Sequence, residues 1–173
     1  MMKPINWELL ASQMSTLREN GGSGSSRHAQ RAIEMLLGED NIKQAVEYYI
    51  TGKPGSELVR SVLSHIRPWS AMKHCYDIYK SDINIENKRV AIELLRVIAD
   101  NRALEWIPEF LEDQDPDIQN WGLGVLDQLL WLRLVTPEEA DRYLQIAEKH
   151  KSFHVREKLE FIKAYLKKRE SKI

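Results

Sequence analysis

The sequence has a single cysteine, Cys75, in 173 residues, so no disulfide can form within the chain. It has no apolar run near the roughly 18 residues that a membrane-spanning helix needs. Its first residues lack the basic segment and apolar stretch of a secretion signal. We therefore expect a cytoplasmic protein without a membrane partner, in which Cys75 is a packed thiol rather than a nucleophile.

An excess of one charge sign is also missing. The chain has 25 Lys and Arg against 26 Asp and Glu, a net charge of −1. We therefore do not expect the molecule as a whole to bind nucleic acid by electrostatic attraction. The charge is nevertheless uneven: residues 1–80 have 10 basic and 8 acidic side chains, residues 81–150 have 7 and 15, and residues 151–173 have 8 and 3. The middle of the chain is thus an acidic block with a net charge of −8.

Alternation of polar and apolar residues at period two, the pattern of a half-buried strand, is not sustained anywhere in the chain. Apolar residues recur instead at helical spacing, and the breaks between these segments contain Gly, Pro, Asp or Asn. We therefore predict an all-α fold. The expected helices span residues 4–20, 27–37, 40–51, 56–66, 69–80, 85–99, 103–111, 117–132, 137–150 and 153–168. Residues 1–26 form an N-terminal helix and a Gly/Ser linker in this interpretation, and residues 27–173 form one repeat region.

A pattern of four apolar positions, at offsets 0, 3, 4 and 7, occurs five times. Its starts are Ala29, Val59, Lys88, Ile118 and Val155, which are 30, 29, 30 and 37 residues apart. This spacing is typical of stacked helical hairpins, each of which buries its apolar stripe against its neighbours. Such an array predicts a binding surface rather than an enclosed active site.

The repeats resemble HEAT repeats. The closest likeness is the segment Asp-Pro-Asp-Ile-Gln at 115–119, which resembles the Asp-Pro turn of that family followed by a Val-Arg start of the second helix. Val59-Arg60 and Val155-Arg156 repeat this start. Lys88 and Gly122 depart from the pattern, because an apolar residue and Ala would be usual there. The resemblance covers residues 27–168 and implies a right-handed α-solenoid of about five hairpins that binds proteins as a scaffold or adaptor.

The first candidate site is the acidic segment 105–117, which has six carboxylates, no basic residue and one tryptophan. Carboxylates beside an aromatic residue are expected where a basic protein partner is attracted and held. A solvated surface with acidic helix caps is the structural alternative. The proposed partner-binding residues are Glu105, Trp106, Glu109, Glu112, Asp113 and Asp115.

The second candidate is the column one residue after each repeat start: Gln30, Arg60, Arg89, Gln119 and Arg156. These side chains could form a ladder that binds an acidic partner. The alternative is that they bond to loop carboxylates or to Glu34, Glu93 and Glu160. Trp121 and Trp131 are expected in the core.

No catalytic, cofactor or metal site is expected. His150 and His154 are four residues apart, but no third ligand is apparent. The preferred function is therefore a non-catalytic protein-binding solenoid, such as a small bacterial-type immunity or inhibitor protein that occludes a basic toxin domain. The alternative is a HEAT-like DNA glycosylase or another nucleic-acid-binding protein, for which the basic residues from Lys163 to Lys172 are the main indication.

Overall fold

The computed structural model describes residues 6, 7, 9, 12 and 26–170. In these residues it has nine α-helices and one 3₁₀-helix and no strand, which confirms the all-α class. None of the described helices is long and apolar enough to cross a bilayer. The expected N-terminal helix and linker lie outside the described residues, apart from four positions of the helix and Ser26.

The helices follow one another with short connections. Their bounds are α2 Ser26–Leu37, α3 Glu39–Ile50, α4 Ser56–Ile66, α5 Trp69–Ser81, α6 Ile85–Ile98, η1 Asn101–Trp106, α7 Ile107–Glu112, α8 Pro116–Trp131, α9 Pro137–Glu148 and α10 Phe153–Glu170. The expected single helix over 103–111 is wrong: the chain forms the 3₁₀-helix η1 and then the short helix α7. Pro108 explains the break, because it has no amide hydrogen for an α-helix that continues from η1, whereas it is tolerated in the first turn of a new helix.

Short polar residues cap the N-terminal ends of α6, α8 and α9. The Asn84 side chain accepts from the amide of Glu86 at the start of α6. Asp115 accepts from two amides at the start of α8. Thr136 and Glu139 form a reciprocal capping box at the start of α9. Each cap satisfies helix amides that have no partner within the helix.

A residue with a left-handed backbone follows each of the helices α4, α6 and α8, directly after α4 and α6 and two residues after the last residue of α8. These residues are Arg67 with φ 46°, Ala99 with φ 54° and Arg133 with φ 57°. Glycine is the usual residue in this conformation, which reverses the chain at a helix end. The three turns lie 32 and 34 residues apart, so the backbone repeats even where the residue type does not.

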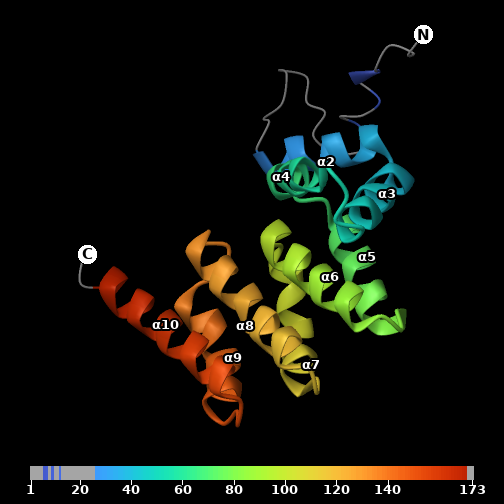
Figure 1. The fold of residues 1–173 in the computed structure, drawn as a ribbon. Helices are drawn as coiled ribbons and strands as arrows, with labels where there is room; N and C mark the ends of the chain where they lie inside the picture. Colours follow the sequence, from blue (N-terminus) through green and yellow to red (C-terminus); the bar gives the residue numbers. More distant parts are fainter. Residues whose placement is uncertain (1–5, 8, 10–11, 13–25, 171–173) are drawn as a thin grey trace.

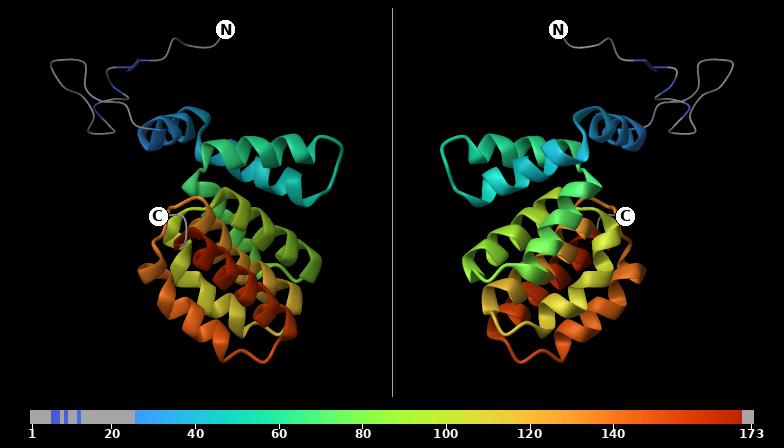
Figure 2. Two further views of the ribbon diagram at one scale, coloured as in Figure 1. Left: turned by 90° about the vertical axis from the view of Figure 1, so that its left-hand side faces the viewer. Right: turned by 90° about the vertical axis from the view of Figure 1, so that its right-hand side faces the viewer.

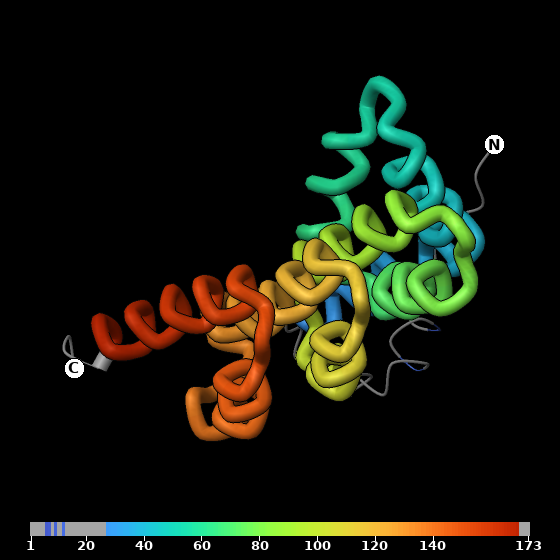
Figure 3. The backbone as a smooth tube through the Cα atoms, turned by 60° about the horizontal axis from the view of Figure 1, so that its bottom comes forward, coloured from blue at the N-terminus to red at the C-terminus, as the bar shows by residue number. Residues whose placement is uncertain are grey.

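The helices form two rows, which Figure 1 shows side by side. In the even row, α2, α4, α6, α8 and α10 each contact the next member; the odd row consists of α3, α5, η1 with α7, and α9. Each odd helix also packs on the even helix that follows it. The side views show α3 and α4 above the later hairpins (Figure 2), and the view from below separates α7 and α9 from α8 and α10 (Figure 3).

The core lies between the two rows. Leu63 and Ile92, both in the repeat pattern, are 1% and 0% exposed, and the pattern positions of α6, α8 and α10 are also mostly buried. In α2, by contrast, Ile33 and Leu36 are 39% and 44% exposed. Because α2 is the first described helix of the even row, it has an even-row neighbour on one side only.

Two glycines of α8 lie where neighbouring side chains come close. A Cβ at Gly122 would be 2.3 Å from Cβ of the buried Phe110 on α7, so a larger residue does not fit here unless the helices move apart. A Cβ at Gly124 would be 2.8 Å from Cδ of Arg96 on α6. The first glycine therefore sets the approach of α7, and the second makes room for an arginine.

The expected core position of Trp131 is wrong, since 62% of this residue is exposed. Trp131 follows Trp121, Gly124 and Gln128 at helical spacing, so these four residues share one stripe of α8. Trp121 is half-buried and packs against the core. The stripe leaves the core towards the C-terminal end of α8, where its last ring contacts Tyr165 of α10 at 5.3 Å between centroids.

Candidate functional site

A groove of ≈ 620 Å³ opens where the turn between α5 and α6 lies next to the turn between α7 and α8. It brings together four of the six predicted partner-binding residues, and we call it the acidic groove. These residues are Glu109, Glu112, Asp113 and Asp115. Tyr79, Ile85 and Lys88, none of which was predicted to bind a partner, also line it.

Glu109 lies on one side of this groove and is held by two residues of α5. Its carboxylate accepts hydrogen bonds from the Tyr76 hydroxyl and the Lys80 ammonium group. Partial burial acts to raise the pKa of Glu109, but the bonds from Lys80 and Tyr76 outweigh it and the pKa is lowered. Burial and the neighbouring carboxylate raise the pKa of Tyr76 to about 12. Glu109 is therefore an anion whose position is fixed.

Asp113 and Asp115 shape the turn between α7 and α8. Asp113 accepts from the Tyr79 hydroxyl at 3.1 Å and from the amide of Asp115 at 2.8 Å. Asp115 caps α8 and binds Arg89 of α6, with 2.7 Å between Nη2 and Oδ2. Arg89 is the main cause that lowers the pKa of Asp115. The turn is thus fixed from α5 by Tyr79 and from α6 by Arg89.

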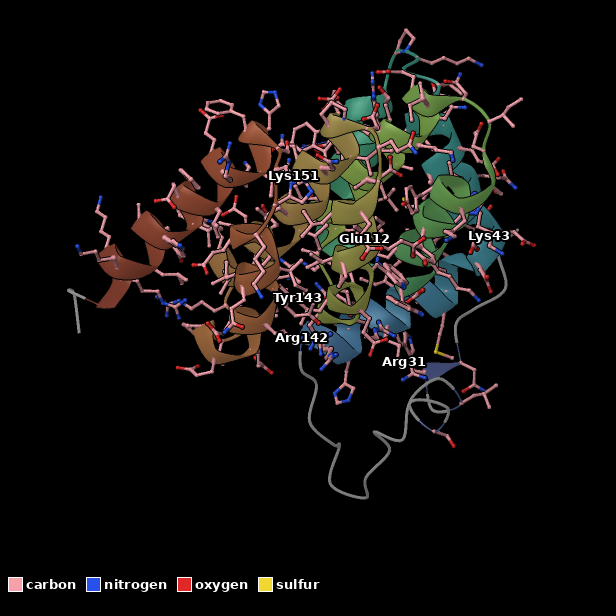
Figure 4. The ribbon with its side chains drawn as sticks, turned by 90° about the horizontal axis from the view of Figure 1, so that it is seen from below. Arg31, Lys43, Glu112, Arg142, Tyr143 and Lys151 are labelled. Atoms are coloured by element: carbon pink, nitrogen blue, oxygen red, sulfur yellow. The ribbon has the colours of Figure 1, made fainter. Side chains whose placement is uncertain are left out.

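Three carboxylates of the segment are exposed, and one of them, Asp117, pairs with Arg89 at 3.4 Å. The other two are Glu105 and Glu112. Within the described residues neither has an ion pair. Glu112 lies at the groove, whereas Glu105 belongs to η1 and does not line it. Seen from below, Glu112 on α7 lies between Arg142 and Tyr143 of α9 on one side and Lys43 of α3 on the other (Figure 4).

Trp106 belongs to a stack of aromatic rings between η1 and α5. Its ring is 4.4 Å from that of Tyr76 and 5.3 Å from that of Trp69, and both pairs are nearly parallel. The Arg102 guanidinium lies 3.9 Å from the centre of the Trp69 ring. Trp106 is half-buried and does not line the acidic groove. The structure therefore places it in helix packing and not on the groove surface.

The absence of basic residues within 105–117 gave a misleading count of local charge. Lys80 and Arg89 reach the segment from one repeat earlier in the chain, and Lys88 lines the groove. The carboxylates of the segment therefore have counter-charges that their own stretch of sequence does not reveal. The carboxylate that remains least neutralised at the groove is Glu112.

Two exposed isoleucines near the start of α6, one of which lines the acidic groove, were also missed. Ile83, in the turn between α5 and α6, is 100% exposed, and Ile85, which lines the groove, is 43% exposed. The signal for them is the segment Asp-Ile-Asn-Ile-Glu at 82–86, in which apolar residues occur in a turn that is otherwise polar. An exposed apolar residue next to carboxylates is a typical contact for a protein partner.

The side chains of the second predicted site, the Arg and Gln column, mostly bond to neighbouring helices and turns. Arg60 binds Glu93 at 2.8 Å, Arg89 binds Asp115, and Gln119 donates to the carbonyl of Asp113 at 2.6 Å. Gln30 of the same column donates to the carbonyl of His65. Arg156 is exposed. The first four side chains therefore contact protein groups within the chain.

Glu93 is the node of this network. It accepts from the Tyr49 hydroxyl and from Arg60 at 2.8 Å each, and Arg96 lies at 3.3 Å. Burial acts to raise the pKa of Glu93, but the bonds from Arg60 and Tyr49 outweigh it and the pKa is lowered. One carboxylate thus joins α3, α4 and α6.

Charge differs between the two rows of helices. The helices of the odd row contain 5 Lys and Arg against 11 Asp and Glu, whereas those of the even row contain 12 against 9. The odd row is therefore acidic, and its carboxylates come from α3 as well as from the acidic block of the sequence. A surface of one sign raises the rate at which an oppositely charged partner is captured.

His150 and His154 do not lie in a metal-binding arrangement. His150 donates from Nε2 to the Leu111 carbonyl at 2.8 Å, and its Nδ1 accepts from the Ser152 amide at 3.0 Å. Both ring nitrogens are thus engaged in the turn before α10. The described part of the chain contains no group of three potential metal ligands.

Comparisons with protein families, with curated proteins and with solved structures find no match to this chain. The function proposed below therefore depends on the residues of the chain itself.

Proposed function

We propose that this chain is a non-catalytic, HEAT-like α-solenoid that binds a basic segment of another protein in the acidic groove. The two rows of helices, the three equivalent left-handed turns and the bonds between successive repeats support the solenoid. Its right-handed twist and its number of about five hairpins are part of the proposal.

The observation that carries the binding function is the acidic groove itself. It places the exposed Glu112 and the Asp113 carboxylate beside Ile85, with Ile83 fully exposed nearby in the chain. A Lys or Arg side chain of the partner would pair with these carboxylates, and an apolar neighbour would cover Ile83. The acidic odd row would raise the association rate, and the apolar contact would slow dissociation.

An inhibitor of immunity-protein type is the most specific form of this function. A basic, nuclease-like toxin domain would present a surface that matches the acidic row, and binding there would exclude its substrate. The small size of the chain and the segregation of charge between the rows agree with this role.

The experiment places a photo-crosslinking amino acid at Ile83 in the full-length protein expressed in its own cells. We expect ultraviolet light to capture a protein with a basic surface, less of it at high salt, and little of it when Glu112→Lys is also present. The matched control is the same amino acid at Leu58 on α4, which is 70% exposed and distant from the groove in the chain. Equal capture at both positions, or capture that Glu112→Lys leaves unchanged, would contradict the proposal.

A further inference from the structure

A second groove, of ≈ 460 Å³, lies on the even row and is lined by residues of α2, α4, α6 and α8 together with the turns after α4 and α8. It contains three arginines, Arg60, Arg67 and Arg96, and has Val97 and Leu132 among its apolar residues. We call it the basic groove. It shares no residue with the acidic groove.

Arg96 is held in one position by its surroundings. Its side chain crosses α8 at Gly124, where only the missing Cβ leaves room, and its guanidinium carbon lies 5.0 Å from the centre of the Trp121 ring. Its Nε is buried and has no hydrogen-bond partner among the described residues. A guanidinium that is fixed before binding loses little conformational entropy when it binds an anion.

The groove retains positive charge after its internal ion pairs are counted. Among the described residues, Glu93 is the carboxylate within ion-pair distance of the groove arginines, and it pairs with both Arg60 and Arg96. The three guanidinium groups and Glu93 sum to +2, while Asp127 and Glu57 act on Arg96 and Arg60 from a longer distance. Arg67 makes a long contact of 3.4 Å from Nε to the Ser64 carbonyl, so most of its donors are available.

The C-terminal ends of α4, α6 and α8 oppose an anion in this groove, because each carries about half a negative charge. Their effect is reduced, since carbonyls at these ends already accept hydrogen bonds, for example Leu63 from Arg67 and Leu95 from Ala99. Guanidinium groups, by contrast, carry a full charge and approach a ligand to hydrogen-bond distance. The arginines therefore determine the sign of the site.

We propose that the basic groove binds a phosphate monoester. At neutral pH this group carries a charge of about −1.5 to −2, which matches the local +2, and it offers three oxygens to guanidinium donors. The groove is larger than a phosphate group alone and lies in the size range of small-molecule sites. The organic part of the ligand would lie against Val97 and Leu132. The phosphate group belongs either to a small metabolite or to a phosphorylated side chain.

The test compares two arginines that follow helices and have a positive φ. Arg67 lines the groove, whereas Arg133 is exposed outside it, so Arg67→Ala and Arg133→Ala remove the same charge at positions of similar φ. The full-length variants are titrated by calorimetry at low salt with inorganic phosphate and with a short Gly/Ala peptide that carries one phosphoserine. The unphosphorylated peptide is the ligand control. Circular dichroism checks that each variant is folded.

We expect one saturable site per chain for both phosphate ligands, about tenfold weaker in Arg67→Ala, which corresponds to about 1.4 kcal/mol, and unchanged in Arg133→Ala. Tighter binding of the phosphopeptide indicates a phosphorylated partner, and equal affinities indicate a metabolite. Gly124→Ala displaces Arg96 without removing a charge and is expected to weaken binding as well.

Three results would overturn the proposal. The first is an equal loss of affinity in Arg67→Ala and Arg133→Ala, which indicates unspecific attraction. The second is equal binding of the phosphorylated and unphosphorylated peptides. The third is tighter binding of single-stranded oligonucleotides with an affinity that grows with their length, which indicates a nucleic-acid surface.

Discussion

Replacement of Gly122 by Ala tests how closely α7 packs on α8. The new Cβ would lie 2.3 Å from Cβ of Phe110 and 3.2 Å from its Cγ, whereas carbon atoms in contact are normally about 3.5–4.0 Å apart. Phe110 is fully buried and its ring packs edge-on against Tyr79 with 5.1 Å between the ring centroids, so the Phe110 side chain has no free space into which it could move. The helices must separate by more than 1 Å, which would disturb the acidic groove as well.

The expected change in the free energy of unfolding combines two effects. An overpacked core costs about 1–3 kcal/mol, and we expect the upper end because the clash involves Cβ, which no rotamer change can move. The higher helix propensity of Ala offsets about 1 kcal/mol of this destabilisation. Gly122→Ala should therefore destabilise the protein by about 2 kcal/mol and lower its unfolding midpoint by about 4–8 °C.

Urea unfolding followed by circular dichroism measures this change, and Gly124→Ala is the matched control on the same helix. Its new Cβ would meet Cδ of Arg96, which can change its rotamer, although it then loses its contacts with Glu93 and Trp121. We expect the stability of this variant to stay within about 1 kcal/mol of the parent. If Gly122→Ala is as stable as Gly124→Ala, the close approach of α7 and α8 is wrong.

Two further changes test the connections between repeats. Glu93→Gln should lower the free energy of unfolding by about 1–3 kcal/mol, since Arg60 and Arg96 lose their buried counter-charge, whereas Glu86→Gln, at an exposed helix position, should lower it by less than about 0.5 kcal/mol. Because the pKa of Glu93 in the folded protein is lowered from its ordinary 4.5, its contribution to stability is complete above that pH and is lost as the pH falls below it. Urea unfolding at a series of pH values measures this loss, and a loss of stability on acidification as large in Glu93→Gln as in the parent would refute it. Arg133→Gly should raise stability by about 0.5–1 kcal/mol, because glycine adopts φ 57° without strain; a loss of stability in urea would show that the turn is not left-handed.

Helix positions could be predicted from the sequence because they depend on local spacing. The range 56–66 coincides with α4, and the predicted start of α9 at Pro137 is that of the structure. The structure differs where local chemistry interrupts the pattern, as at Pro108. It also differs at Trp131, whose apolar character suggested burial although its stripe of α8 turns away from the core.

The candidate site could be predicted only in part, since its carboxylates are neighbours in sequence and their counter-ions are not. Lys80 and Arg89 lie 29 and 26 residues before Glu109 and Asp115, and Arg60 lies 33 residues before Glu93. In this structure these cations reach carboxylates on, or just before, the next helix of their own row. Charge balance must therefore be counted across the row of helices as well as within one helical turn.

The two grooves lie at opposite ends of the same helix. Ile85 and Lys88 of α6 line the acidic groove, and Arg96 and Val97 line the basic groove, about 16 Å further along at 1.5 Å per residue. The neighbouring α8 runs in the same direction, because Arg89 near the start of α6 binds Asp115 at the start of α8, and Leu132 follows the end of α8 at the basic groove. Carboxylates at the starts of parallel helices and arginines at their ends stabilise the helix dipoles.

This arrangement separates charges that serve the fold from charges that are available to ligands. Asp115 is used by the cap of α8 and by Arg89, and Arg60 is used by Glu93. Glu112 is exposed at the acidic groove, and Arg67 keeps most of its hydrogen-bond donors available at the basic groove. A ligand gains most from groups whose hydrogen bonds within the protein are not yet made, since no existing interaction must be broken. Binding is therefore expected to depend on Glu112 and Arg67, and stability on Asp115 and Glu93.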